Sequence, residues 1–121
     1  LLAQSDVVSL HLPLSRETTG LIDAKALATL PEGAILLNTS RGAIIDEGAL
    51  LAALESGRLA GAALDVLADE TAVAASPLLA FAEHDERLLI TPHIGGATHE
   101  AMERTEIFMA EKLARHLGSD A

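Results

Sequence analysis

The sequence predicts an α/β fold, a parallel sheet whose strands alternate with helices. Two observations predict it. Short apolar runs recur along the chain, and segments with helix-capping residues separate them. Such an alternation produces parallel strands joined by right-handed crossovers. The chain has 121 residues, 50% of them hydrophobic, which is enough for one compact domain with an apolar core.

Four strands are expected. They are Asp6–Leu12, Ala34–Asn38, Ala60–Leu67 and Arg87–Thr91. The second and third are nearly continuous apolar runs, as expected of strands buried on both faces. Four strands are about half of a roughly six- or seven-stranded doubly wound sheet. One edge of the sheet is therefore expected to need a covering partner.

Helices are expected between and after these strands. Asp23 caps a short helix that runs to Leu30, and Asp46 caps a second that ends near Gly57. Thr98 caps a last helix to about Leu117, with Gly118 as its stop. The apolar residues of this helix form a packing face, for the core or for a subunit contact: Met102, Ile107, Phe108 and Leu113. Residues 69–86 are expected to be irregular, with one helical turn near Pro77–Phe81.

Composition excludes several classes of function. The formal net charge of −10 disfavours nucleic-acid binding. No apolar run approaches the roughly 18 residues that a membrane helix needs. The chain has no Cys, which excludes disulfides, thiolate metal sites and Cys nucleophiles and fits a cytoplasmic protein. His99-Glu100 opens like the zinc-protease pattern H-E-x-x-H, but Glu103 occupies the position of the second His, so no metal site is expected.

Chemically capable side chains follow the predicted strands. Ligands of such sheets lie at the carboxyl ends of the strands. The segments at those ends are 11–13, 38–41, 65–70 and 91–93. Together they contain an Arg, two Asp, a Glu and two His. This convergence indicates a functional site. No glycine-rich phosphate-binding motif accompanies it.

Three segments together carry a family resemblance. They are SDVVSLHLPLSRETTGLID at 5–23, LNTSRGAIIDEGALLAALESGRLAGAALDV at 37–66 and LLITPHIGGAT at 88–98. In them the chain resembles the D-isomer-specific 2-hydroxyacid dehydrogenases, such as the phosphoglycerate dehydrogenase-like members. The resemblance implies that residues 1–121 are the C-terminal half of a Rossmann-like NAD-binding domain. The G-x-G-x-x-G half and most of the substrate domain would then lie outside these residues.

The resemblance also implies three catalytic residues. Arg41 matches the Arg of N-T-S-R-G, and His93 matches the His of T-P-H-I-G. Glu70 matches the Glu that follows the Asp-Val pair, although Thr71 stands where the family commonly has Pro and Asp69 is a close competitor. A His paired with a carboxylate can exchange a proton with the substrate oxygen. A planar guanidinium can hold a carboxylate through two hydrogen bonds.

The implied cofactor is NAD, with NADP not excluded because the residue that contacts the ribose would lie upstream. The cofactor-binding positions implied by the resemblance are Leu12, Pro13, Thr39, Ser40, Arg41, Asp65, His93, Gly95 and Gly96. Glycines let a backbone approach a cofactor closely. Asp65, inside an apolar run, needs a partner if it is buried, either the cofactor or a backbone amide.

The expected function is hydride transfer between nicotinamide and a small D-2-hydroxy acid or 2-oxo acid. We expect a homodimer with no nucleic-acid or membrane partner. One alternative is an NAD-sensing, non-catalytic module, as in the C-terminal binding protein corepressors that share this scaffold. The other is a fragment that is inactive alone, because residues 1–121 contain no phosphate-binding fingerprint.

Overall fold

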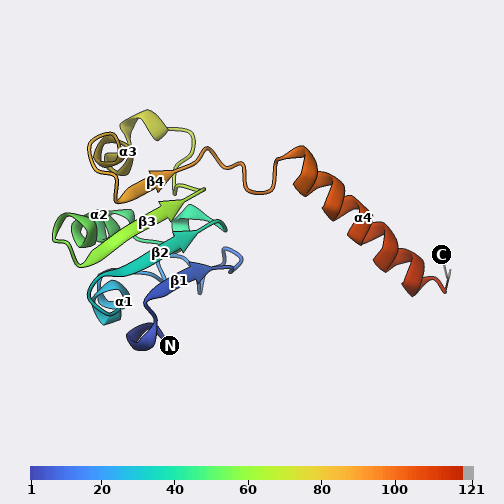
Figure 1. Cartoon of the computed structure of the whole chain (residues 1–121), viewed down its shortest axis with the longest axis horizontal. Helices are drawn as coiled ribbons and strands as arrows, with labels where there is room; N and C mark the ends of the chain where they lie inside the picture. Colours follow the sequence, from blue (N-terminus) through green and yellow to red (C-terminus); the bar gives the residue numbers. More distant parts are fainter. Residues whose placement is uncertain (119–121) are drawn as a thin grey trace.

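A four-stranded parallel sheet forms the body of the molecule. The computed structural model describes residues 1–118. The strands are β1 (Val7–Leu10), β2 (Ala34–Asn38), β3 (Leu59–Leu64) and β4 (Leu88–Ile90). They lie side by side in the order β1-β2-β3-β4, the same as in the sequence, and every pair is parallel (Figure 1). The predicted α/β class and the four-stranded parallel sheet are confirmed.

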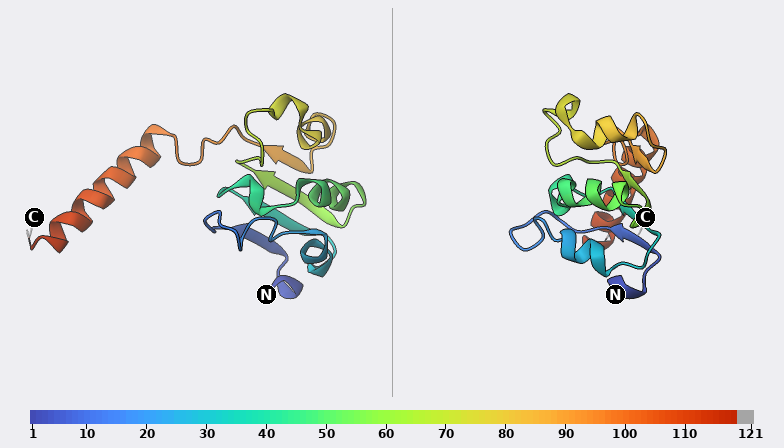
Figure 2. Two further views of the ribbon diagram at one scale, coloured as in Figure 1. Left: turned by 180° about the vertical axis from the view of Figure 1, so that it is seen from behind. Right: turned by 90° about the vertical axis from the view of Figure 1, so that its left-hand side faces the viewer.

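Three short helices cover one face of this sheet. They are α1 (Ala24–Thr29), α2 (Glu47–Glu55) and α3 (Pro77–Ala82). Each lies in the connection between two neighbouring strands. A sheet that grows in one direction through right-handed crossovers places all of these connections on the same side, as the side view in Figure 2 shows.

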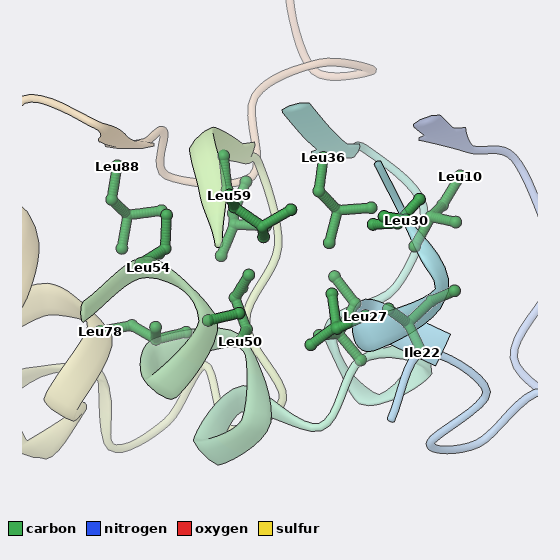
Figure 3. Packing of buried hydrophobic residues seen from close by; sticks show 14 of the residues in the cluster. Leu10, Ile22, Leu27, Leu30, Leu36, Leu50, Leu54, Leu59, Leu78 and Leu88 are labelled. Atoms are coloured by element: carbon green, nitrogen blue, oxygen red, sulfur yellow. The ribbon is translucent and has the colours of Figure 1, made fainter. Parts of the chain in front are cut away.

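The core lies between the sheet and these helices. Leu36, Leu59 and Leu88 come from three strands and are at most 4% exposed. They point toward the helices, where they meet leucines of α1, α2 and α3 (Figure 3). Those helical leucines are Leu27, Leu50, Leu54 and Leu78, all at most 2% exposed. This layer holds the strands in place and thereby fixes where their carboxyl ends lie.

The opposite face of the sheet is apolar and uncovered. Val7 is 55% exposed, and its register partner Ile35 is 39% exposed. Leu89, in the edge strand β4, is 60% exposed on this face. The sequence predicted an uncovered edge, whereas residues 1–118 leave a whole face without a helix. A doubly wound sheet carries helices on both faces, whereas the helices packed on this sheet in residues 1–118 lie on one face (Figure 2).

The last helix, α4 (His99–His116), extends away from the sheet (Figures 1 and 2). None of its residues is buried, and its predicted packing residues Met102, Ile107, Phe108 and Leu113 are all more than half exposed. They therefore do not belong to the core of residues 1–118. No helix among the described residues is both long and apolar enough to cross a membrane.

The predicted helix starts are confirmed by their caps. Asp23 accepts a hydrogen bond from the Ala26 amide, and Asp46 accepts one from the Ala49 amide. Thr98 caps α4 in the same way through Ala101. Gly57 ends α2 with a φ of 73°, a left-handed conformation that glycine adopts without strain. Local side-chain chemistry therefore sets these boundaries.

The predicted strand ends and the irregular segment need correction. β1 ends at Leu10 rather than Leu12, and β3 ends at Leu64 rather than Leu67. Val66 and Leu67 are buried, although they lie in the loop that follows β3, so the apolar run continues beyond the strand. Residues 69–86 hold more helix than predicted, namely the 3₁₀ turn η3 (Val73–Ala75) and the six-residue α3. The other 3₁₀ turns are η1 (Leu2–Gln4) and η2 (Gly42–Ile44).

Candidate active site

The site residues lie where the strands end. Arg41 follows β2 after a short turn, Asp65 directly follows β3, and Glu70 lies in the loop after β3. His93 lies three residues beyond the end of β4. Because all four strands are parallel, these segments meet at one end of the sheet. The predicted convergence is present in the fold.

Glu70 and His93 are in direct contact. Nδ1 of His93 lies 2.9 Å from each carboxylate oxygen of Glu70. The two side chains are 44% and 46% exposed, so an ion pair between them contributes little to stability. The consequence of this contact is orientation. With Nδ1 held by Glu70, Nε2 is the ring nitrogen left to reach a ligand.

Arg41 faces the same cavity as this pair. The cavity has a volume of about 320 Å³ and is lined by Leu14, Arg41, Gly42, Ala43, Leu67, Ala68, Glu70 and His93. The Arg41 side chain is exposed, and its Nη1 donates to the Ser40 carbonyl oxygen over 2.6 Å. One cavity therefore brings together a guanidinium, an imidazole and a carboxylate.

Asn38 shapes the turn that carries Arg41. Its side chain is fully buried at the end of β2. Oδ1 accepts hydrogen bonds from the amide and the hydroxyl of Ser40, while Nδ2 donates to the Arg41 carbonyl oxygen. A buried amide that uses both of its ends fixes the backbone around it. The sequence analysis assigned Asn38 to the strand and missed this role. A polar residue ending an apolar strand was the available signal.

Asp65 holds the backbone beside His93. Asp65 is 6% exposed, and its carboxylate accepts hydrogen bonds from the Thr91 hydroxyl and from the Ile94 and Gly95 amides, at 2.6–2.9 Å. His93 stands between these donors with a φ of 54°, a left-handed conformation that is uncommon for a residue with a side chain. Asp65 therefore stabilises the loop that presents His93.

The surroundings of Asp65 also set its charge. Burial acts to raise the pKa of Asp65, but the Thr91 hydroxyl, the Gly95 and Ile94 amides and the nearby His93 lower it more, so the net shift is downward. Of the two partners considered for a buried Asp65, backbone amides are present here. Thr91 joins the residues that the sequence analysis missed.

Asp69, the alternative to Glu70 as the partner of His93, binds Thr71 instead. Its Oδ1 accepts hydrogen bonds from the hydroxyl and the amide of Thr71, at 2.6 and 3.0 Å. These bonds, that from the hydroxyl first, lower the pKa of Asp69. Thr71 therefore binds Asp69, while Glu70 contacts His93.

The remaining predicted cofactor positions lie in three different environments. Thr39 and Asp65 line a cavity of about 230 Å³ on the uncovered face of the sheet, together with His11 and with residues of all four strands. Leu12, Pro13 and Gly96 are exposed, and a Cβ on Gly96 would meet nothing within 4 Å. Gly95 differs, because a Cβ there would lie 2.9 Å from Oδ2 of Asp65. The contact with Asp65 explains a glycine at position 95.

A more apolar cavity lies behind the pair. It has a volume of about 360 Å³ and its walls include Leu67, Val73, Leu79 and Ile90 beside Glu70 and His93. α3 and η3 supply one side of it. The Glu70–His93 contact therefore borders two cavities. Arg41 lines the cavity of about 320 Å³ and does not line this more apolar one.

Known proteins resemble this chain over nearly all of its length. An (S)-sulfolactate dehydrogenase of Chromohalobacter salexigens is 48% identical over 118 residues, which are 98% of this chain and 37% of that protein. A D-3-phosphoglycerate dehydrogenase of Escherichia coli K12 is 42% identical over 96% of this chain and 28% of that protein. The chain thus spans about a third of the length of these curated relatives.

A solved structure and a family profile agree with these relatives. The NAD-complexed D-isomer specific 2-hydroxyacid dehydrogenase from Lactobacillus delbrueckii ssp. bulgaricus superposes with a TM-score of 0.78 at 32% identity, over 99% of this chain and 40% of that one. The profile described as the D-isomer specific 2-hydroxyacid dehydrogenase, NAD binding domain, matches residues 1–95. The chain therefore belongs to the NAD-binding domain family of the D-isomer specific 2-hydroxyacid dehydrogenases.

Proposed function

We propose that the protein containing this chain is an NAD-dependent oxidoreductase. It transfers a hydride between nicotinamide and carbon 2 of a small 2-oxo acid or D-2-hydroxy acid. The observation that supports this most strongly is the cavity shared by Arg41, Glu70 and His93. It combines a carboxylate-binding group with an acid–base pair around one cavity of about 320 Å³.

His93 exchanges the proton. Reduction of a 2-oxo acid builds negative charge on the carbonyl oxygen, and an imidazolium can protonate that oxygen through Nε2. Glu70, 2.9 Å from Nδ1, holds the ring in one orientation and leaves Nε2 to face the substrate oxygen. In the reverse direction neutral His93 accepts the hydroxyl proton of the D-2-hydroxy acid.

Arg41 binds the substrate carboxylate. A guanidinium can donate two parallel hydrogen bonds to a carboxylate, which fixes both the position and the plane of the acid. Because Asn38 and Ser40 hold the backbone of the turn, Arg41 projects into the cavity from a fixed base. The same guanidinium can polarise the substrate carbonyl.

NAD supplies the hydride when it is bound. The nicotinamide ring would lie in the cavity on the uncovered sheet face, whose lining includes Thr39, Ala63 and Asp65. The residues that would border the nicotinamide are Thr39, Ser40, Arg41, Asp65, His93 and Gly95. Leu12 and Pro13 would border the adenosine. Gly96 would let the backbone approach the cofactor closely. Asp65 would contact the nicotinamide while its carboxylate also holds the loop that carries His93.

Residues 1–121 would act as the C-terminal half of the NAD-binding domain. The half with the glycine fingerprint and the substrate domain would lie outside these residues, in a cytoplasmic homodimer. Two observations support this arrangement: the uncovered apolar face of the sheet, and the coverage of about a third of the curated relatives. The intact mass and the light-scattering mass of the natural gene product test it, with two domains per subunit and two subunits expected.

Turnover tests the activity. The natural gene product is mixed with NADH, or separately with NADPH, and a panel of 2-oxo acids that includes glyoxylate, hydroxypyruvate and sulfopyruvate. We expect oxidation of the nicotinamide and formation of the D-2-hydroxy acid of at least one member. Tight NADH binding without turnover of any of them would contradict the proposal in favour of a non-catalytic NAD-sensing module. Neither binding nor turnover would contradict it in favour of an inactive fragment.

A further inference from the structure

A hydrogen bond outside the proposed catalytic set connects α2 with the loop that carries Glu70. Oε1 of Glu47 accepts a hydrogen bond from the Ala68 amide over 2.7 Å, across 21 positions of sequence. Glu47 is the first residue of α2, while its neighbour Asp46 caps that helix through Ala49. The two acidic residues therefore have different partners: Asp46 binds its own helix, and Glu47 binds the loop after β3.

The turn that carries Arg41 touches the same loop. A Cβ on Gly42 would lie 2.0 Å from the carbonyl carbon of Leu67 and 2.3 Å from the Ala68 amide nitrogen. Only a residue without a side chain allows two backbones to come this close. Gly42 and Glu47 thus contact the loop at adjacent residues, one by packing and one by a hydrogen bond.

The other side of this turn is fixed as well. The Gly20 amide donates to the Ala43 carbonyl oxygen, and the Ile22 amide donates to the Ile44 carbonyl oxygen. The turn is consequently held between residues 20–22 and the loop of 67–68. A displacement of the loop would therefore move Glu70 relative to Arg41, because hydrogen bonds to residues 20–22 hold the turn in place.

We propose that Glu47 is a positioning residue for the site. By holding the Ala68 amide it keeps the loop against the turn, and it thereby sets the spacing between Arg41 and the Glu70–His93 pair. This inference rests on the proposed function for its effect on turnover. Its structural part, the dependence of the loop on the Glu47–Ala68 bond, is independent of turnover.

Kinetics of the natural gene product test the effect on the site. The E47A variant loses the hydrogen bond, whereas E47Q retains an oxygen that can accept it. A misplacement of about 1 Å can cost on the order of 100-fold in rate, so we expect E47A to lower kcat by about 10- to 100-fold with an NADH KM close to that of the wild type. E47Q should restore most of this loss, and the E55A control removes an exposed Glu from the same helix.

Two kinetic results would overturn the inference. The first is an E47A variant whose kcat equals that of E55A. The second is an E47Q variant as impaired as E47A, because the effect would then come from charge rather than from the hydrogen bond. An enzyme that only lost stability would melt earlier but would keep its kcat below the melting temperature.

Hydrogen exchange separates this inference from the proposed function. In the 121-residue chain, the Ala68 amide should exchange at least about tenfold faster in E47A than in the wild type, E47Q and E55A. The NMR signals of Glu70 and the His93 ring should shift in E47A alone. A wild type without turnover would defeat the proposed function, and exchange would still decide whether the Glu47–Ala68 hydrogen bond holds the loop. Equal exchange in all four proteins would overturn the inference whatever the kinetics show.

Discussion

Oδ2 of Asp65 lies 2.8 Å from the amide nitrogen of Gly95, and the same oxygen leaves no space for a Cβ on that glycine. The G95A variant should therefore lose stability, by about 1–3 kcal/mol, because the new methyl group must displace the carboxylate or the loop. Urea denaturation of the 121-residue chain measures this. G96A is the matched control, since a Cβ there meets nothing within 4 Å. A G95A variant as stable as G96A would contradict the close packing of the Asp65 carboxylate against the loop that carries His93.

The same carboxylate predicts a pH dependence of stability. The pKa of Asp65 in the folded chain lies below its ordinary value, so its contribution is present above the unfolded pKa of about 3.9 and is lost as the pH falls through the folded pKa. The D65N variant should cost about 1–3 kcal/mol near neutrality, because an amide cannot accept all three hydrogen bonds. The difference from the wild type should shrink below about pH 4. A difference that is constant down to pH 2 would contradict it.

A second acidic residue, Asp85, also predicts a loss of stability at low pH. Hydrogen bonds from the side chain and amide of Arg87 lower the pKa of Asp85 to about 2. The stabilisation from this pair should be complete above about pH 4 and should be lost as the pH falls toward 2. Acid denaturation of the wild type and D85N should therefore converge over that interval. D85N should leave intact the hydrogen bond from Arg87, which directly precedes β4, to the Leu54 carbonyl oxygen of α2. Curves that remain parallel would contradict this assignment.

Features that depend on neighbouring residues could be predicted from the sequence. The caps Asp23, Asp46 and Thr98 each accept a hydrogen bond from an amide three residues ahead. The sequence therefore predicted the starts of α1, α2 and α4 correctly. The end of β3 could not be predicted, because Val66 and Leu67 are as buried in the loop as the strand residues before them. An apolar pattern reports burial rather than backbone conformation.

Contacts between distant segments explain what the sequence analysis missed. Arg41, Glu70 and His93 were chosen through a family resemblance, and the fold places them around one cavity. Glu47 was not chosen, because nothing near it in the sequence reveals that its partner is the Ala68 amide 21 positions away. The uncovered face was also missed, since alternation along a strand cannot tell which of two apolar faces the helices cover.

The most direct test of the site is the steady-state kinetics of His93 and Arg41 variants of the natural gene product. We predict that H93Q lowers kcat by about 10²- to 10⁴-fold and leaves NADH binding intact, as expected for the loss of an acid–base group. R41K should mainly raise the KM for the 2-oxo acid, because an ammonium cannot make the paired hydrogen bonds of a guanidinium. H99Q, at the exposed start of α4, is the matched control. An H93Q variant that turns over within about threefold of H99Q would contradict the central claim that His93 transfers the proton.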